Sequence, residues 1–303
     1  MMIVSVGEVV WDIFPEREVL GGAPVNVAYH LATQGLPVRV ITRVGRDQLG
    51  EATLTRLEEL GLPLNGVQRD ERLPTGRVKV SFGLDGEPAY EIVAPAAWDN
   101  IEPAPALAAA GEKPFALVFG TLAQRDPRSR RAILALAAAA RFCFYDVNLR
   151  PPFTPRELVV ASLEQADLVK VNGAELSQLG VWLGLAAADA TATDHATRQA
   201  LAAALRERYR LAALVVTEGA EGAWVVSAAG VFVGAGTPAR VVDTVGAGDA
   251  FFASLIADYS ARNPDWTDSS AALPWPEILG RANRRGAYVA SRAGATPPMP
   301  ADL

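Results

Sequence analysis

The sequence has one cysteine, two histidines and no long apolar run. Cys143 alone cannot form an intrachain disulfide, which favours a reducing compartment, and the surrounding "RFCFYDV" is typical of a buried strand. His30 and His195 are too few and too far apart for a histidine-based metal or catalytic centre. The N-terminus lacks the basic and apolar segments of a secretory signal, and no segment reaches the ~18 apolar residues of a membrane span. We therefore expect a cytoplasmic protein with no membrane partner.

Motifs of several common enzyme classes are also missing. The chain contains no Gly-Lys pair and hence no P-loop, no G-x-G-x-x-G follows its first apolar segment, and no G-x-S-x-G occurs. These absences argue against P-loop enzymes, nicotinamide-dependent oxidoreductases and α/β-hydrolases. The net charge of −6 argues against a nucleic-acid partner, although local N–H groups and arginines could still hold a small anion.

Strand-like and helix-like segments alternate over most of the 303 residues. This alternation predicts an α/β fold, with one doubly wound, mostly parallel sheet flanked by helices, in a single domain over residues 1–303. The expected strands are 3–10, 38–45, 115–120, 141–148, 166–172, 212–219 and 238–242. The expected helices are 24–34, 48–60, 127–140, 155–165, 195–209, 276–292 and those that begin near 173 and 247.

Two antiparallel hairpins interrupt this alternation, and the first is expected at 75–93. Its apolar and polar residues alternate, and "DG" at 85–86 is a strong tight-turn signal. A hairpin inside an α/β chain fits a small lid, which we expect to be formed by about 12–20 and 75–95. The alternation also permits a homodimer through the lid without requiring one. A second hairpin is expected at 221–234.

Polar residues follow several of the predicted strands. Ligands of such sheets bind at the carboxyl ends of the strands, so we expect the functional site at that edge. In "DVNLR", a period of two would place the polar side chains on one side of an extended segment. The polar residues expected at the edge are Asp12, Asp146, Asn148, Arg150, Asn172, Glu175 and Glu218.

The segment "DTVGAGDAFF" places a glycine-rich turn directly before an apolar helix. Gly246, Ala247 and Gly248 could expose backbone N–H groups to an anion such as a phosphoryl group in transfer. Asp249, in the first helical turn, could then take a proton from an attacking hydroxyl. The same residues are also explained as an ordinary helix start, with Asp249 near the positive end of the helix dipole.

Other candidate sugar-binding residues also admit two explanations. Gly22 and Asn26 in "GGAPVN" fit either a tight turn into a helix or contacts to sugar hydroxyls. Asp12 fits either a loop carboxylate or an acceptor for two hydroxyls. Trp98 fits either a sugar-lining ring or a core residue.

The polar residues nearer the middle of the chain are equally open. Asn172 and Glu175 fit either a helix capping box or a site for metal-bound water. Arg150 fits either a phosphate clamp or a surface salt bridge. The spacing of these residues fits both explanations in each case.

Taken together, these segments resemble the ribokinase-like (PfkB) family of carbohydrate kinases, over nearly the whole chain and in the family's order. The last of the matching segments is the family's second signature, and the one that begins with "GGAPVN" is close to its first. Within the family, the "GEVVWDIFP", "GGAPVN" and "DVNLR" regions are most similar to bacterial fructokinases. The matching segments are "GEVVWDIFP", "GGAPVNVAYHLATQG", "RVGRDQLG", "DVNLRPPF", "KVNGAEL", "VVTEGAEGA" and "VDTVGAGDAFFASLIA".

The resemblance implies an ATP-dependent sugar kinase, most similar to fructokinases, with Asp249 as the general base. It implies ATP and Mg²⁺ as cofactors and, in many members, K⁺ or another monovalent cation. The catalytic positions it implies are Gly246, Ala247, Gly248 and Asp249, and the sugar-binding positions are Asp12, Gly22 and Asn26, with Trp98 and Arg150 as further candidates. The ATP-binding positions are Asn172, Thr217, Gly219, Gly248 and Asn283, and the metal positions are Glu175, Asp243 and Val245, with the loop around Gly294 opposite.

The identity of the sugar stays open, because the lid diverges most within the family and sets the substrate. The alternatives are a 2-keto-3-deoxygluconate kinase, a ribokinase, a nucleoside kinase and a non-catalytic sugar-binding regulator. An acidic sugar would call for a basic residue, for which Arg17, Arg77 and Arg150 are candidates. Glu218 stands where many relatives have a small or neutral residue, and 184–200 matches no motif.

Overall fold

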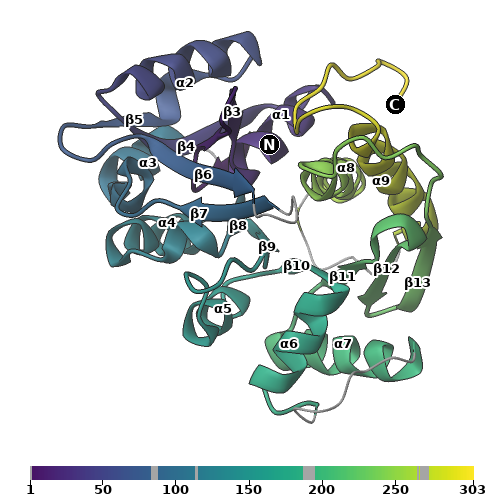
Figure 1. Ribbon diagram of the computed structural model, residues 1–303. Coiled ribbons are helices and arrows are strands. Elements are labelled where there is room, and N and C mark those ends of the chain that lie inside the picture. Colours follow the sequence, from purple (N-terminus) through teal and green to yellow (C-terminus); the bar gives the residue numbers. More distant parts are fainter. Residues whose placement is uncertain (1, 83–87, 113–114, 187–194, 265, 267–272) are drawn as a thin grey trace. The chain divides into compact units, whose positions relative to one another are not determined.

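The computed structural model describes residues 2–82, 88–112, 115–186, 195–264, 266 and 273–303. Its contacts divide the chain into two compact units, an N-terminal unit, Met1–Ala140, and a C-terminal unit, Arg141–Leu303. Each unit contains parallel strands and helices (Figure 1), which confirms the predicted α/β class. The single domain over residues 1–303 stays a prediction. Within the described residues, no helix is both long enough and apolar enough to cross a membrane.

The main sheet of the N-terminal unit has four parallel strands in the order β8-β1-β4-β5. Their apolar side chains are almost all buried, as expected for a parallel sheet covered by helices. The strands are β1 (Met2–Val6), β4 (Val38–Gly45), β5 (Val67–Asp70) and β8 (Phe115–Gly120). The helices are α1 (Ala23–Ala32), α2 (Gln48–Glu59), α3 (Pro103–Ala110) and α4 (Pro127–Ala139), with short 3-10 turns η1 (Leu64–Gly66), η2 (Ala97–Asn100) and η3 (Leu122–Gln124).

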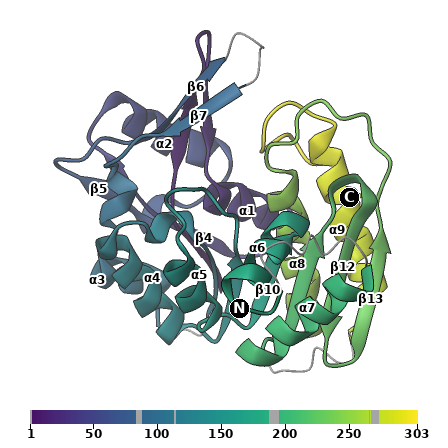
Figure 2. The ribbon, with the colours of Figure 1, turned by 60° about the horizontal axis from the view of Figure 1, so that its bottom comes forward.

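A second sheet in the N-terminal unit has the order β3-β2-β6-β7, and Figure 2 labels its neighbouring strands β6 and β7. It joins the two segments that were predicted to form the lid. On β6, Val78 and Val80 are buried while Arg77 and Lys79 are exposed, which confirms the predicted alternation. The predicted tight turn at 85–86 lies outside the described residues. The strands are β2 (Val10–Ile13), β3 (Glu18–Gly21), β6 (Gly76–Phe82) and β7 (Pro88–Ile92).

The strand predicted at 3–10 is instead two strands, because the chain turns after β1. Gly7 has a φ of +150°, and a Cβ atom there would lie 2.8 Å from Cγ of Pro24. Only glycine fits this conformation at this spacing. The turn sends the chain from the main sheet into the second sheet. Asp12 therefore lies on β2 and not at the end of the first strand.

The sheet of the C-terminal unit has the order β13-β12-β11-β10-β9. β9, β10 and β11 are parallel, and β12 and β13 form the predicted second hairpin at its edge. The strands are β9 (Phe142–Asp146), β10 (Leu168–Asn172), β11 (Ala213–Thr217), β12 (Gly222–Ser227) and β13 (Gly230–Ala235). The helices are α5 (Arg156–Leu163), α6 (Gly173–Trp182), α7 (His195–Tyr209), α8 (Ala247–Arg262) and α9 (Trp275–Ala290), with a 3-10 turn η4 (Gly219–Glu221).

The strand predicted at 238–242 is wrong. The chain between β13 and α8 adopts no regular secondary structure, and Val241 and Val242 are exposed by 62% and 61%. A β-branched pair favours a strand only where it can pack on a neighbouring strand or sheet face. Pro238 also lacks the N–H that a sheet ladder needs.

Aromatic packing fixes helix α8 against strand β9. The ring centroid of Tyr259 lies 5.1 Å from that of Phe142 and 5.7 Å from that of Phe144. Phe252, two turns earlier on α8, packs edge-on against Phe144 at 6.3 Å. These pairs contribute stability beyond the area that they bury. They also hold the first turn of α8, which carries the glycine-rich motif, in a defined position beside the sheet.

Cys143 lies on β9 and is 3% exposed, which confirms the predicted buried cysteine. Burial, together with the nearby charge of Asp167, raises the pKa of its thiol to about 12. At pH 8 this leaves a thiolate fraction roughly a thousandfold smaller than that of a free cysteine. We therefore expect native protein to react with a thiol reagent such as DTNB at least about a thousandfold more slowly than urea-unfolded protein, since burial also limits access of the reagent. Full labelling of the native protein within minutes would contradict this burial.

Candidate active site

A cavity of about 580 Å³ in the C-terminal unit, here called the main cavity, brings together six of the predicted site residues. Its volume suits a small organic ligand. These residues come from β10, the adjacent β11 and η4, and from α8 and α9, so the convergence of these distant segments is a result of the fold and not of local spacing. The six residues are Asn172, Thr217, Gly219, Ala247, Gly248 and Asn283.

Small residues form much of the remaining wall of the main cavity. Gly286, Ala287 and Ala290 contribute from α9, and Gly236 from the loop after β13. A flat ring can approach such a wall closely, because no long side chain stands in front of the backbone. None of these positions belongs to a motif found in the sequence analysis.

Asn283 lines the main cavity and also stabilises the fold. Its side-chain Nδ2 donates hydrogen bonds to the carbonyls of Gly234 and Ala235, each at 2.9 Å. Both bonds tie the end of β13 to α9. A ligand that contacts Asn283 would therefore meet a side chain whose orientation is already fixed.

The glycine-rich turn forms the start of α8. Gly246 has a φ of +77°, and a Cβ atom there would lie 2.5 Å from Cβ of Ala295, so both conformation and space require glycine. The N–H of Ala247 donates to the carbonyl of Thr244 at 3.3 Å and is thus partly used within the turn. N–H groups in the first turn of a helix have no carbonyl one turn earlier. Gly248 is therefore better placed than Ala247 to face an anion.

A buried ion pair lies beside this turn. Nζ of Lys170, on β10, donates to both carboxylate oxygens of Asp146, at the end of β9, each at 2.9 Å. The two side chains are 9% and 6% exposed. A Cβ atom on Gly248 would lie 3.6 Å from Nζ of Lys170, so the ammonium group is adjacent to the first turn of α8.

Sequence reasoning missed Lys170. Burial alone would lower the pKa of its ammonium group, but the charge and hydrogen bonds of Asp146 outweigh this effect, so the pKa is raised. Glu175 and Asp249 contribute in the same direction. The available signal was a single lysine inside the apolar run "LVKV", because a buried charge requires a partner of opposite sign.

Asn172 and Glu175 form the predicted capping box at the start of α6. Oδ1 of Asn172 accepts from the N–H of Glu175 at 2.9 Å, and Oε2 of Glu175 accepts from the N–H of Asn172 at 2.8 Å. Oε1 of Glu175 also accepts from the N–H of Leu149, at 2.9 Å. Burial, followed by the charge of Asp146, raises the pKa of Glu175. Since both of its oxygens already accept backbone N–H groups, Glu175 fits a metal contact through water better than direct coordination.

Asp243 ties together the two segments predicted to hold a monovalent cation. Its Oδ1 accepts from the N–H of Val245 at 3.0 Å, and its Oδ2 accepts from the N–H of Gly294 at 3.0 Å. The structure thus brings Asp243, Val245 and Gly294 into one region. Among the residues that it describes, no group of three or more His, Cys, Asp or Glu side chains is placed to hold a metal ion.

The predicted sugar-binding residues Asp12, Gly22 and Asn26 lie close together in the N-terminal unit. A Cβ atom on Gly21 would lie 3.3 Å from Oδ2 of Asp12, so this carboxylate stands beside the glycine pair before α1. Gly22 has a φ of +116°, and a Cβ atom there would lie 2.5 Å from the carbonyl oxygen of Glu8. The carbonyl of Gly22 accepts from the N–H of Asn26 at 3.0 Å.

Trp98 is a core residue in this structure. Its side chain is completely buried, and the guanidinium of Arg125 lies 3.9 Å from the centroid of its ring. A ring covered in this way offers no face to a sugar, so we remove Trp98 from the predicted sugar site. Asp99 holds the same arginine in a buried ion pair at 2.7 Å, which stabilises the arrangement.

The extended geometry predicted for "DVNLR" is wrong. β9 ends at Asp146, and Asn148 then adopts a φ of +38°, so the segment turns instead of continuing with a period of two. Asp146 is buried, whereas Arg150 is exposed and donates to the carbonyl of Leu149 at 2.9 Å. The structure therefore separates Arg150 from the buried Asp146–Lys170 pair.

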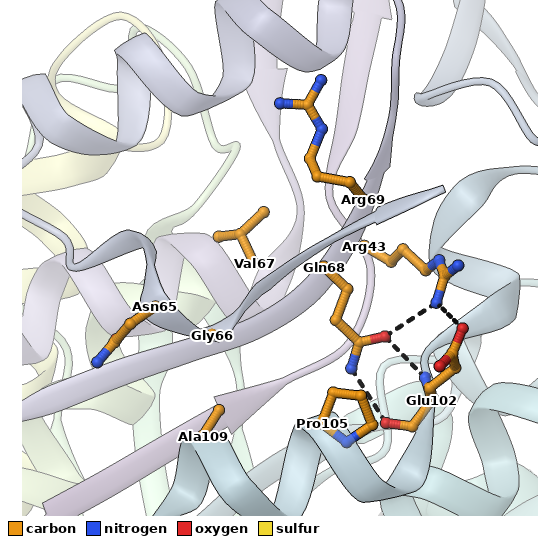
Figure 3. A pocket seen from close by; sticks show the side chains of 9 residues that line it. All are labelled: Arg43, Asn65, Gly66, Val67, Gln68, Arg69, Glu102, Pro105 and Ala109. Carbon is orange, nitrogen blue, oxygen red and sulfur yellow. Dashed lines mark hydrogen bonds and ion pairs between the residues drawn. The ribbon is translucent and has the colours of Figure 1, made fainter. Parts of the chain in front are cut away.

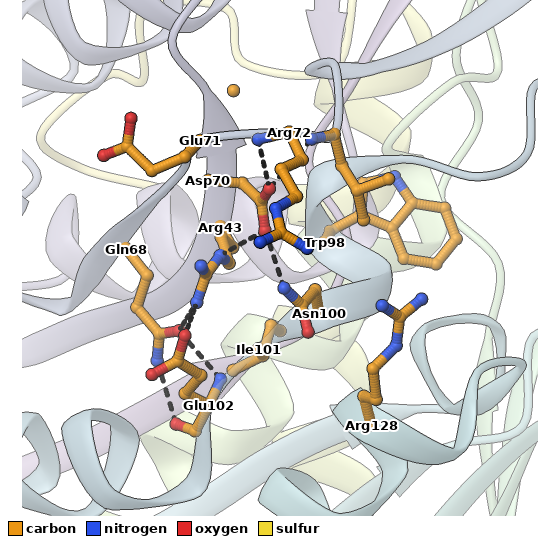
Figure 4. Close-up of polar contacts among 12 residues, drawn as sticks. Arg43, Gln68, Asp70, Glu71, Arg72, Trp98, Asn100, Ile101, Glu102 and Arg128 are labelled. Carbon is orange, nitrogen blue, oxygen red and sulfur yellow. Dashed lines mark hydrogen bonds and ion pairs between the residues drawn. The ribbon is translucent and has the colours of Figure 1, made fainter.

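A second cavity, of about 320 Å³, lies in the N-terminal unit between β5 and α3 (Figure 3). Arg43 is its central charge, and it pairs with Asp70 at 2.8 Å and with Glu102 at 2.6 Å (Figure 4). Gln68 and Glu102 exchange two further hydrogen bonds, of 3.0 and 2.8 Å. These contacts give every charged group a partner of opposite sign and connect β4 and β5 to the start of α3. None of the predicted site residues lines this cavity, and we assign it a structural role.

Comparison with known proteins identifies the family. Residues 7–302 match the pfkB family of carbohydrate kinases. The chain belongs to this family. A fructokinase of Vibrio alginolyticus is 28% identical over 310 residues, which cover 97% of this chain and 94% of that protein.

Solved structures of sugar kinases share the fold. The aminoimidazole riboside kinase of Salmonella enterica, in complex with aminoimidazole riboside and an ATP analogue, is 25% identical with a TM-score of 0.79, over 98% of this chain and 95% of that chain. The fructokinase of Xylella fastidiosa, with bound ATP, is 23% identical with a TM-score of 0.83, over 97% of this chain and 94% of that chain. The fold is thus the ribokinase-like α/β fold, and the chain is an ATP-dependent sugar kinase, a phosphotransferase.

Proposed function

We propose that this kinase is a fructokinase that phosphorylates a primary hydroxyl of a ketohexose, with Asp249 as the general base. The observation that carries the proposal is the main cavity, where six residues expected to serve nucleotide and anion binding meet at the first turn of α8. Asp249 is the next residue of that turn after Gly248. The preference for fructose is supported by the fructokinase relatives.

Each part of the chain has a defined task in the proposed reaction. Asp12, Gly22 and Asn26 hold the sugar hydroxyls, and Asp249 accepts the proton of the attacking hydroxyl as it reacts. The N–H groups of Gly248 and Asp249, at the positive end of α8, stabilise the charge on the phosphoryl group. ATP supplies that phosphoryl group. The β3-β2-β6-β7 sheet acts as the lid that excludes water, a competing acceptor.

We infer that the main cavity is the ATP site, with Asn172, Thr217 and Gly219 near the phosphates and Asn283 near the adenine. Its volume of about 580 Å³ and its small-residue wall suit a flat base. Mg²⁺ would enter with the nucleotide, and Glu175 would contact it through water. Asp243 and Val245 remain the proposed positions for K⁺. A homodimer through the lid remains a proposal as well.

The proposal is tested by ADP release with Mg-ATP across fructose, tagatose, ribose, 2-keto-3-deoxygluconate, adenosine and aminoimidazole riboside. We expect kcat/KM for fructose to exceed every other value by at least about tenfold, equivalent to about 1.4 kcal/mol of preferential transition-state binding. Preferred turnover of another acceptor would move the assignment to that sugar. Sugar binding without ADP release would favour the non-catalytic regulator.

A nucleoside-type acceptor is the second candidate. It is favoured by the likeness to the Salmonella enterica structure with bound aminoimidazole riboside. The same panel separates the two candidates, because it contains the preferred acceptor of each. Turnover of aminoimidazole riboside above that of fructose would support this second candidate.

A further inference from the structure

Glu218 is an acidic residue at the edge of the proposed nucleotide site. Its two neighbours in the chain, Thr217 and Gly219, both line the main cavity. Glu218 itself lines an adjoining, shallow depression of about 470 Å³, to which Thr217, Gly219 and Asn172 also contribute. Glu218 thus stands between two residues of the main cavity wall, and it lines the depression that shares three residues with that cavity.

Three groups hold the carboxylate in this position. Arg198, on α7, forms an ion pair with it, and both side chains are 16% exposed. Nε1 of Trp224, a buried residue of β12, donates to its Oε1 at 2.9 Å. A Cβ atom on Gly173 would lie 2.8 Å from its Oε2, so the carboxylate also lies at the N-terminus of α6. The indole N–H and the helix dipole stabilise the negative charge even without the arginine.

A fixed negative charge here is unfavourable for a nucleotide. The phosphates of Mg-ATP carry net negative charge, and the residues proposed to lie near them are the immediate neighbours of Glu218. Like charges at such a partly buried position repel each other appreciably, because the effective dielectric constant is well below that of water. A cation adjacent to Glu218 would offset this repulsion.

We propose that Arg198 is a positioning residue for nucleotide affinity, because it neutralises Glu218 beside the phosphate end of the main cavity. The proposal rests on the assignment of that cavity to ATP. Gly173 is part of the arrangement, since a Cβ atom there would lie 2.5 Å from Nη2 of Arg198 and 2.8 Å from Glu218. Arg198 lies in the segment 184–200, which matches no motif of the family.

The test is a charge cycle measured by calorimetric titration of the full-length protein with Mg-ATP, Mg-ADP and AMP. For Arg198→Ala, we expect the Kd of Mg-ATP to rise about tenfold, as for one uncompensated charge near the phosphates. The rise should be smaller for Mg-ADP and smallest for AMP, since the repulsion scales with phosphate charge. The double variant Arg198→Ala/Glu218→Gln should bind Mg-ATP within about twofold of wild type, because it removes both charges.

Steady-state kinetics give a second readout. In Arg198→Ala, KM for ATP should rise about tenfold, whereas kcat at saturating ATP should change by less than about twofold. Arg208→Ala is the matched control, because it removes the same charge from the last turn of the same helix, where Arg208 donates to the carbonyl of Leu183 and lies 5.7 Å from the ring centroid of Tyr209. This control should leave the Kd of Mg-ATP unchanged.

Two results would overturn the inference. One is an unchanged Kd of Mg-ATP in Arg198→Ala. The other is an equal loss of affinity for Mg-ATP and AMP that Glu218→Gln does not restore, because that pattern indicates a purely structural role. Failure of the underlying assignment gives a different result. If the wild-type protein binds no Mg-ATP, the main cavity is not a nucleotide site, and this inference is wrong as well.

Discussion

Replacement of Asp249 by asparagine is expected to lower kcat for the preferred sugar by about 10²–10⁴-fold. Asparagine keeps the size and polarity of the side chain but cannot accept a proton from the attacking hydroxyl. The N–H groups at the start of α8 are unaffected by the change, so the affinity for Mg-ATP should stay within about threefold of wild type. Coupled ADP release gives kcat, and calorimetric titration with Mg-ATP gives the affinity.

A second aspartate on α8 provides the control for this experiment. Asp258 lies toward the other end of the helix, where it pairs with Arg262 at 2.9 Å and with Arg281 at 2.6 Å. Asp258→Asn therefore removes the same charge from the same helix without touching the glycine-rich turn. We expect its kcat to stay within about twofold of wild type. If Asp249→Asn loses less than about tenfold in kcat, another group must accept the proton, and the assigned role of Asp249 is wrong.

Helix bounds and helix caps could be predicted well where the sequence has a strong helical periodicity or a clear capping motif. α7 begins and ends at the predicted residues, and the Asn-x-x-Glu spacing predicted the capping box of α6. Strands predicted from composition were wrong where a special backbone conformation or the lack of a neighbouring strand determines the structure. Gly7 divides one apolar run into two strands, and Val241 lies in an exposed loop, since β-branched residues form strands only when a neighbouring surface is available.

The chemistry of the site depends more on tertiary contacts than the fold class does. The glycine-rich signature contains Asp249, but it contains neither Lys170 nor Arg198. Lys170 begins the matching segment "KVNGAEL", but its spacing suggested no role for it. The Lys170–Asp146 pair joins residues on neighbouring parallel strands, so it follows from strand order and register, which local sequence does not specify. The prediction that Trp98 lines the sugar site was wrong for a related reason. The sequence around an isolated tryptophan does not show which side chains will cover its ring.

The largest expected effect on stability comes from breaking the buried Lys170–Asp146 ion pair. Lys170→Met should lower the free energy of unfolding by about 3–5 kcal/mol, because the carboxylate of Asp146 is left buried without its cation. The pKa of Lys170 is raised in the fold, so the stabilising contribution is fully present below the unfolded-state value of about 10.4 and is lost only above it. The difference between wild type and variant should therefore be constant from pH 7 to about pH 9. Urea unfolding followed by circular dichroism measures it.

Cys143 offers a local measurement of the same effect, since it lies three residues before Asp146 on β9. If the thiol reacts only through opening of the C-terminal unit, a loss of about 3 kcal/mol should speed its DTNB labelling by about a hundredfold. Lys170→Met/Asp146→Leu removes both charges and should recover most of the lost stability, because no unpaired charge then remains buried. Lys79→Met breaks a pair whose side chains are 63% and 67% exposed and should cost at most about 1 kcal/mol. Equal losses in Lys170→Met and Lys79→Met would mean that solvent reaches the Asp146 carboxylate, contrary to its burial in the structure.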